Sequence, residues 1–152
     1  MKHVTLLFLH RDNQILLAMK KRGFGVNKWN GVGGKLDEGE SREQAAVREC
    51  QEEIGVTPRN IQLVGEIDFT DLPHVHHYCH VYTTAEWEGE PTETEEMRPE
   101  WFDLDKIPYD SMWPDDELWL PKLLEGKTFT AEIIINPDDT VQKCNITEVD
   151  KL

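Results

Sequence analysis

The segment that most constrains the fold is residues 34–56, GKLDEGESREQAAVRECQEEIGV, because its second half encodes a helix with both ends marked. Ser41 stands where an N-cap belongs, and Gln44 follows three residues later, which is the spacing of a capping box. Gly55 is suited to end the helix in the left-handed conformation. The sequence therefore predicts a helix over residues 42–54, with a loop on either side.

Three glutamates fall on one face of this predicted helix. Glu49, Glu52 and Glu53 are spaced at i, i+3 and i+4, so their carboxylates lie side by side and repel one another. One interpretation is an exposed acidic face. The other is a metal site, because clustered oxygens suit hard cations such as Mg²⁺ or Mn²⁺, which would relieve the repulsion. Gly33 and Gly34 favour the metal site, since a glycine backbone can approach an ion or a phosphate closely.

Residues 34–56 also follow the pattern G-x5-E-x7-R-E-U-x-E-E-x-G-U, in which U is aliphatic. This pattern resembles the Nudix box, the loop-helix-loop metal site of the Nudix hydrolases. Its departure is Cys50, which stands at an aliphatic position and is expected to pack as a small buried hydrophobe. The matching residues are Gly34, Glu40, Arg48, Glu49, Glu52, Glu53, Gly55 and Val56. The resemblance implies a Nudix-type αβα sandwich with a mixed β-sheet.

The rest of the chain predicts an α+β domain in its own right. Pro114 fits the first position of a second helix that runs to about residue 124. Residues 86–96 are acidic and contain glycine and proline, so they are expected to form an exposed loop. Apolar runs bounded by turn-forming residues predict strands over residues 3–10, 14–20, 61–69, 78–84, 97–104, 129–135 and 141–149.

A histidine-rich segment, residues 71–77, separates two of these predicted strands. Its side chains His74, His76 and His77 could bind a transition metal. A polar loop is the interpretation that we favour.

Length and charge restrict the partners. A chain of 152 residues without internal repeats is predicted to form a single domain, residues 1–152. Its net charge of −14 leaves no basic surface for a nucleic-acid polymer, and no apolar stretch is long enough to span a membrane. Cys50, Cys79 and Cys144 form neither a zinc motif nor an evident disulfide framework, which favours the reducing cytoplasm. We expect a monomer that binds a small-molecule nucleotide.

Outside the box, four short segments are similar to the animal-type 8-oxo-dGTP diphosphatases, a Nudix subfamily. They are KKRGFG (20–25), KWNGVGGK (28–35), EMRPEWF (96–102) and MWPDD (112–116). This resemblance implies Mg²⁺-dependent hydrolysis of oxidised purine nucleoside triphosphates, such as 8-oxo-dGTP and 2-hydroxy-dATP. The products would be the monophosphate and pyrophosphate, and the reaction would sanitise the nucleotide pool.

The same resemblance implies where metal and substrate bind. The implied metal ligands are the Gly33 carbonyl and the side chains of Glu49, Glu52, Glu53 and Glu96. The implied purine pocket consists of Asn30, Trp113, Asp115 and Asp116, lined by Phe24, Phe69 and Met97. The other predicted substrate contacts are Thr5, Lys20, Gly33, Gly34, Lys35 and Pro114.

The residue types suit this chemistry independently. A purine needs a flat apolar platform, which Trp113 would supply; a core tryptophan is the alternative, which we favour less. If Asp115 and Asp116 are buried side by side, both cannot ionise easily, so the pKa of one should rise. The pair would then offer a donor and an acceptor to a base edge. Two acids that help a helix to start are the alternative.

Glu53 is the predicted general base, because it shares the metal face and could reach an attacking water. Glu52 is the second candidate, and Glu96 is a third if its loop folds over the site. Arg48 is expected to position these glutamates through ion pairs, while Glu40 braces the loop.

The box assigns a chemistry but not a substrate. One alternative is a Nudix diphosphatase for another purine nucleotide, such as ADP-ribose, a dinucleoside polyphosphate or a methylated purine triphosphate. A second is a non-catalytic nucleotide sensor, which would need no general base. A structural or interaction protein ranks last, because it leaves the ordered spacing of the acids unexplained.

Overall fold

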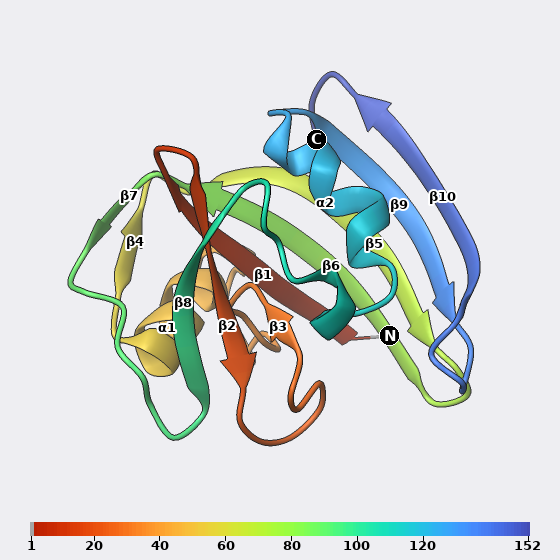
Figure 1. The fold of residues 1–152 in the computed structure, drawn as a ribbon, viewed down its shortest axis with the longest axis horizontal. Coiled ribbons are helices and arrows are strands. Elements are labelled where there is room, and N and C mark those ends of the chain that lie inside the picture. The colour runs from red at the N-terminus through yellow and green to blue at the C-terminus, as the bar shows by residue number, and fades with distance from the viewer. Residues whose placement is uncertain (1) are drawn as a thin grey trace.

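A computed structural model describes residues 2–152 of the chain. They form two α-helices, a short 3-10 helix, one large β-sheet and a separate pair of short strands (Figure 1). The strands are β1 (Lys2–Arg11), β2 (Gln14–Lys20), β3 (Trp29–Asn30), β4 (Thr57–Arg59), β5 (Gln62–Asp71), β6 (Val75–Thr84), β7 (Glu86–Glu88), β8 (Met97–Asp103), β9 (Thr128–Ile135) and β10 (Val141–Val149). The helices are α1 (Arg42–Ile54), the 3-10 helix (Tyr109–Ser111) and α2 (Asp116–Leu124).

The large sheet is mixed, as the sequence predicts. Its strand order is β10-β9-β5-β6-β1-β2-β3, and β8 also pairs with β2. Strand β1 runs parallel to β6, and β5 runs parallel to β9. The other pairs in this sheet are antiparallel.

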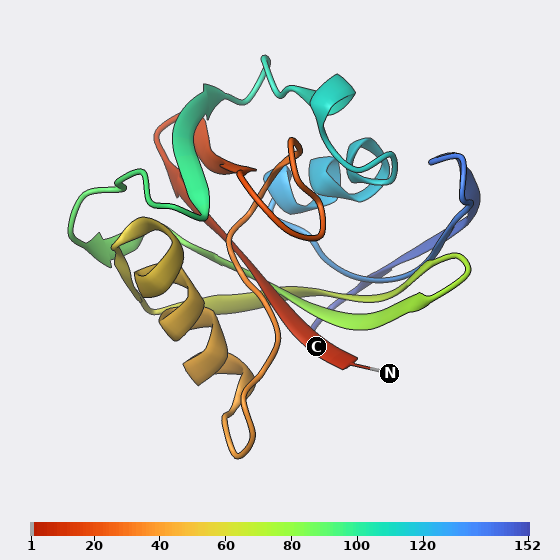
Figure 2. The ribbon, with the colours of Figure 1, turned by 90° about the horizontal axis from the view of Figure 1, so that it is seen from below.

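The helices cover the two faces of the sheet. Helix α1 packs against β1, β4 and β8, whereas α2 packs against β9 on the other side (Figure 2). The predicted αβα sandwich is therefore confirmed. Among residues 2–152, no helix has the length and apolar character that crossing a membrane requires.

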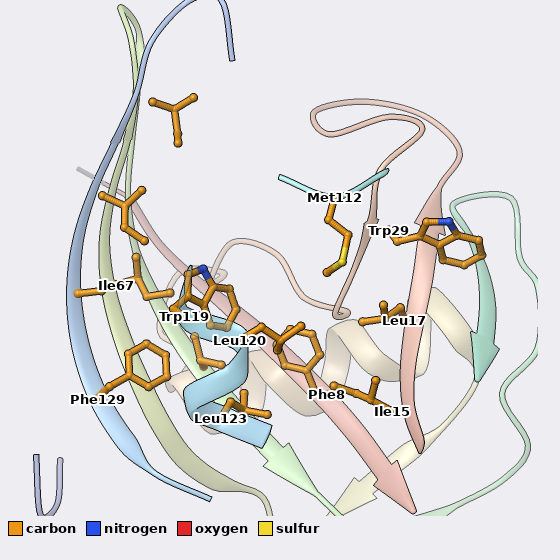
Figure 3. Close-up of a cluster of buried hydrophobic side chains, with 14 residues drawn as sticks. Phe8, Ile15, Leu17, Trp29, Ile67, Met112, Trp119, Leu120, Leu123 and Phe129 are labelled. Atoms are coloured by element: carbon orange, nitrogen blue, oxygen red, sulfur yellow. The ribbon is translucent and has the colours of Figure 1, made fainter. Parts of the chain in front are cut away.

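Burial on both faces explains the unbroken apolar runs at the start of the chain. In β1, Leu7 and Leu9 belong to the core beneath α1, while Phe8 belongs to the core beneath α2. Ile15 and Leu17 of β2 join Phe8 in the α2-side core (Figure 3). Because successive side chains of a strand point to opposite faces, both sets must be apolar when both faces are covered.

Helix α1 forms as predicted, with both ends fixed by local hydrogen bonds. The Gln44 N–H donates to Ser41 Oγ at 3.1 Å, and the Ser41 N–H donates to Gln44 Oε1 at 2.9 Å, which completes the capping box. Gly55 ends the helix with φ of 73°. Cys50 is fully buried in the α1-side core, so its expected role as a small hydrophobe is confirmed.

Helix α2 begins two residues later than predicted. It starts at Asp116 with Asp115 as its N-cap, so the placement of Pro114 at the first helical position is wrong. The Asp116 N–H donates to the Trp113 carbonyl at 3.0 Å, which closes a turn through Pro114 and Asp115 before the helix starts. The proline therefore belongs to the turn that delivers the two aspartates.

Two predicted loops are partly strand. Strand β5 runs to Asp71 and β6 starts at Val75, so His76 and His77 are strand residues, contrary to the prediction of a polar loop. Backbone pairing between Asp71 and Val75 accounts for this, because strand hydrogen bonds do not require apolar side chains. The predicted acidic loop 86–96 likewise begins with β7, which pairs with β4.

Candidate functional site

A cavity of about 170 Å³ lies on the α2 side of the sheet. Its walls come from strands β1, β2, β3, β5, β6 and β8, the β2–β3 connection, the loop after β3, and the start of α2 with the segment that leads into it. The sequence-predicted residues that line it are Thr5, Lys20, Phe24, Asn30, Gly33, Gly34, Phe69, Met97, Trp113, Asp115 and Asp116. The fold thus brings most of the predicted substrate contacts together.

Aromatic rings form one side of the cavity. The Trp113 ring centroid lies 5.0 Å from that of Phe24 and 5.6 Å from that of Phe69. Trp113 is half-buried and lines the cavity, so it is not a core tryptophan. Lys28 Nζ lies 5.2 Å from the centre of the Trp113 ring, a cation–π distance. This wall offers a flat apolar surface to a planar ligand.

Asp115 and Asp116 form the polar part of the cavity. Both are 3% exposed. Asp115 Oδ2 accepts a hydrogen bond from Trp119 Nε1 at 2.8 Å, but within residues 2–152 Asp115 Oδ1 and Asp116 Oδ2 are buried without a partner. Burial raises the pKa of both carboxyls, and the neighbouring Asp115 raises that of Asp116 further. A retained proton gives the pair one donor beside several acceptors.

This arrangement makes stability depend on pH. A carboxyl whose pKa is raised in the folded state contributes stability that is present below its unfolded pKa of about 3.9 and is lost as the pH rises through the folded pKa. An asparagine does not ionise, so Asp116→Asn removes the stability loss that the wild type suffers as the pH rises. We therefore expect the Tm of the variant, relative to the wild type, to increase as the pH rises above about 4. Thermal unfolding of both proteins across this range checks the prediction, and a constant difference in Tm would contradict it.

Arg48 holds Glu40, in the loop before α1, and two acids of α1 in place. Its Nε donates to Glu40 Oε2 at 2.7 Å, and its Nη1 donates to Glu49 Oε1 at 2.9 Å and to Glu52 Oε2 at 3.2 Å. These are the contacts expected of a positioning residue. The hydrogen bond from Arg48 also keeps the pKa of Glu40 below its ordinary value.

Glu53 differs from its neighbours because it is buried, with 1% exposure. Its Oε1 accepts a hydrogen bond from the Gly33 N–H at 3.1 Å, whereas its Oε2 is buried without a partner in the described part of the chain. Burial, followed by the nearby Glu49 carboxylate, raises the pKa of Glu53 to about 8. A buried carboxylate held against a backbone loop is costly for stability, which suggests a functional role.

The carboxylates fit a hard cation, although they are not already arranged around one. Within residues 2–152, no three His, Cys, Asp or Glu side chains are grouped to hold a metal. Glu49 and Glu52 pair with Arg48, and the predicted ligand Glu96 pairs with Arg22 at 3.6 Å. The unpartnered Glu53 Oε2 nevertheless offers an oxygen ligand. The Gly34 backbone also lies so close to Glu49 that a Cβ would meet its carboxyl carbon at 2.8 Å.

Two predicted substrate contacts, Lys35 and Pro114, lie outside the cavity lining. Other lining residues were not singled out as contacts by the sequence analysis: Val4, Leu6, Gly25, Lys28, Gly31, Ile67, His77, Cys79 and Trp119. Strand alternation could have found some of them. Ile67 shares a strand face with Phe69, and His77 is in register with Phe69 on the neighbouring strand.

Comparison with known proteins agrees with this geometry. The profile of a family described as "NUDIX domain" matches residues 1–123. The chain is 44% identical to the oxidized purine nucleoside triphosphate hydrolase of Danio rerio, over 99% of this chain and 97% of that protein. It is 43% identical to the protein of the same name from Mus musculus, over 96% of this chain and 94% of that protein. A crystal structure of the mutator protein MutT from Bacillus halodurans shares the fold, with a TM-score of 0.86, 24% identity and coverage of 96% of this chain and 97% of that chain.

Proposed function

The chain belongs to the Nudix family, and from this premise we propose that it hydrolyses oxidised purine nucleoside triphosphates to the monophosphate and pyrophosphate. Substrates of this class include 8-oxo-dGTP and 2-hydroxy-dATP, and their removal would sanitise the nucleotide pool. The observation that carries the proposal is the pair of buried, partly unpartnered aspartates in an aromatic cavity. The names of the vertebrate relatives support the same activity.

Base recognition follows from the groups on the cavity wall. A purine that stacks on Trp113 would direct its polar edge toward Asp115 and Asp116. One protonated and one ionised carboxyl can bond to an edge that carries both donors and acceptors, and the two can exchange roles between different bases. Asn30 Oδ1 accepts the Gly31 N–H at 2.8 Å, which leaves the Asn30 amide N–H groups for the ligand.

The catalytic groups lie on the helix α1 side of the Gly33-Gly34 backbone. We assign proton acceptance from the attacking water to Glu53, which must be ionised for that role. A nearby cation favours the ionised form, because it lowers the pKa of a carboxyl. As the new oxygen–phosphorus bond forms, the bond to pyrophosphate breaks. Lys20 lines the cavity and can pair with the phosphates.

The donor set is suited to Mg²⁺, or Mn²⁺, held by the Gly33 carbonyl together with Glu49, Glu52, Glu53 and Glu96. When bound, the cation would neutralise phosphate charge and increase the acidity of the attacking water. Arg48 would then orient Glu49 and Glu52 rather than touch the substrate.

We also propose that residues 1–152 act as a single-domain monomer on a small-molecule nucleotide in the cytoplasm. The pairing of β9 with β5 supports one domain, because it joins the last hairpin to the main sheet. The free thiols of Cys50, Cys79 and Cys144 support a reducing compartment.

Metal removal tests the proposed chemistry. We expect 8-oxo-dGTP to yield its monophosphate and pyrophosphate in the presence of Mg²⁺, and turnover to stop when a chelator is added, because charge neutralisation at the phosphates is lost. Adding Mg²⁺ back should restore the rate. Ion-exchange chromatography of the products checks both statements. Release of inorganic phosphate alone, or turnover that persists in the chelator, would refute the proposal.

A further inference from the structure

Phe24, Phe69, Trp113 and His77 line the cavity and form an aromatic box on one side of it. The His77 ring centroid lies 5.8 Å from that of Phe24, at an interplanar angle of 84°. Phe24 contacts Trp113, which contacts Phe69 in turn. Phe69 and His77 are register partners on β5 and β6, so their side chains lie next to each other on one face of the sheet. Trp113 carries one indole N–H donor, whereas His77 is the member of this aromatic box whose ring offers both a donor and an acceptor nitrogen to a ligand.

His77 differs from the other histidines of β6. His76 Nε2 lies 2.6 Å from Asp68 Oδ1, and His80 is buried with its Nδ1 3.2 Å from Arg42 Nη1. Both have partners away from the cavity. In the part of the chain that the structure describes, the His77 ring lines the cavity and makes no side-chain hydrogen bond of its own. A half-buried ring without a partner is available to a ligand.

The position of His77 along β6 indicates which end of a purine it would meet. Cys79 lines the cavity together with Asp115 and Asp116, and both carboxyls add to the effect of burial in raising the pKa of its thiol. His77 lies two residues before Cys79 on the same face of β6, about 7 Å away. A purine has its donors and acceptors for the aspartates on the six-membered ring. Its five-membered ring then points toward the end of the cavity that His77 occupies.

We propose that His77 is a specificity-determining residue that donates a hydrogen bond to the C8 oxygen of 8-oxopurine nucleotides. This inference rests on the proposed function. An unmodified guanine carries a C–H group at that position, which offers no acceptor. Burial, and then the nearby lysines Lys35 and Lys2, lower the pKa of His77, so the ring is neutral and keeps a single N–H donor. The bond adds to recognition by the aspartates, which read the opposite edge of the base.

The test compares kcat/KM for 8-oxo-dGTP and dGTP in three variants with Mg²⁺ present. In His77→Met the ratio between the two substrates should fall about five-fold, the scale of one neutral hydrogen bond, through a higher KM for 8-oxo-dGTP. His77→Gln keeps a donor and should retain at least half of the wild-type ratio. His76→Met is the matched control, because its ring faces Asp68 outside the cavity, and it should leave the ratio unchanged.

A binding measurement separates this inference from the proposed function. Quenching of tryptophan fluorescence gives the Kd of 8-oxo-dGMP and dGMP without metal or turnover, and His77→Met should weaken only the former. An unchanged ratio in His77→Met, or an equal loss for both nucleotides, would overturn the assignment and make His77 a packing residue. Failure of the wild type to hydrolyse 8-oxo-dGTP would instead refute the proposed function. Thermal unfolding verifies that each variant is folded.

Discussion

Replacing Glu53 with glutamine is expected to lower kcat by at least about 100-fold, the usual scale for loss of a general base. Glutamine keeps the size of the side chain and can still accept the hydrogen bond from the Gly33 N–H. It cannot accept a proton from water, and its amide is a weaker ligand for Mg²⁺. The fold should survive, because an amide is cheaper to bury than a carboxylate. Single-turnover rates with 8-oxo-dGTP measure the effect on the chemical step.

Glu38→Gln is the matched control, since Glu38 is exposed in the loop before α1. It changes the net charge by the same amount and should leave kcat unaltered. A near-normal rate in Glu53→Gln would remove Glu53 from the role of base. Glu52, which is more exposed and hydrogen-bonded to Arg48, would then be the next residue to substitute.

Replacing Trp113 with alanine is expected to lower kcat/KM by about 30-fold, because stacking of a base on an aromatic ring contributes about 1–3 kcal/mol. The loss should lie mainly in KM, since the ring holds the base and does not touch the reacting phosphorus. Trp113 also packs against Phe24 and Phe69, so its removal opens two walls of the cavity. Steady-state kinetics with 8-oxo-dGTP and Mg²⁺ give both constants.

Trp87→Ala controls for the general cost of losing a large ring. Trp87 packs against Trp101 at a centroid distance of 5.6 Å and does not line the cavity. This variant should lower Tm while leaving KM unchanged. If Trp113→Ala keeps the wild-type KM, the base does not stack on Trp113 and the assigned pocket is wrong.

The sequence predicts best those features that depend on neighbouring residues. The capping box of Ser41 and Gln44 and the left-handed Gly55 fix α1 locally, so pattern and structure agree. The apolar runs around Phe8 and Leu16 predict strands because both faces of each strand are covered. The positions of Trp113 and Asp116 in the cavity were predicted by family resemblance, and strand periodicity alone would not have placed them there.

Features that depend on distant contacts were missed. Strands β4 and β7 are short, and they pair with each other through contacts such as Arg59 with Glu86. Neither strand carries the apolar alternation that would predict it from the sequence. The sequence predicts His77 in a polar loop, and its place in the cavity was missed because it depends on register with Phe69 across β5 and β6. The burial of Glu53 and the ion pair of Glu96 with Arg22 also depend on tertiary packing.

The central claim is that this cavity selects oxidised purine triphosphates, and competing substrates test it most directly. The measurement is kcat/KM for 8-oxo-dGTP, 2-hydroxy-dATP, dGTP and ADP-ribose under identical conditions with Mg²⁺. We predict that both oxidised triphosphates exceed dGTP by at least ten-fold, about 1.4 kcal/mol in the transition state. Equal values for dGTP, or a preference for ADP-ribose, would contradict the proposed selectivity and leave only a Nudix hydrolase of another specificity.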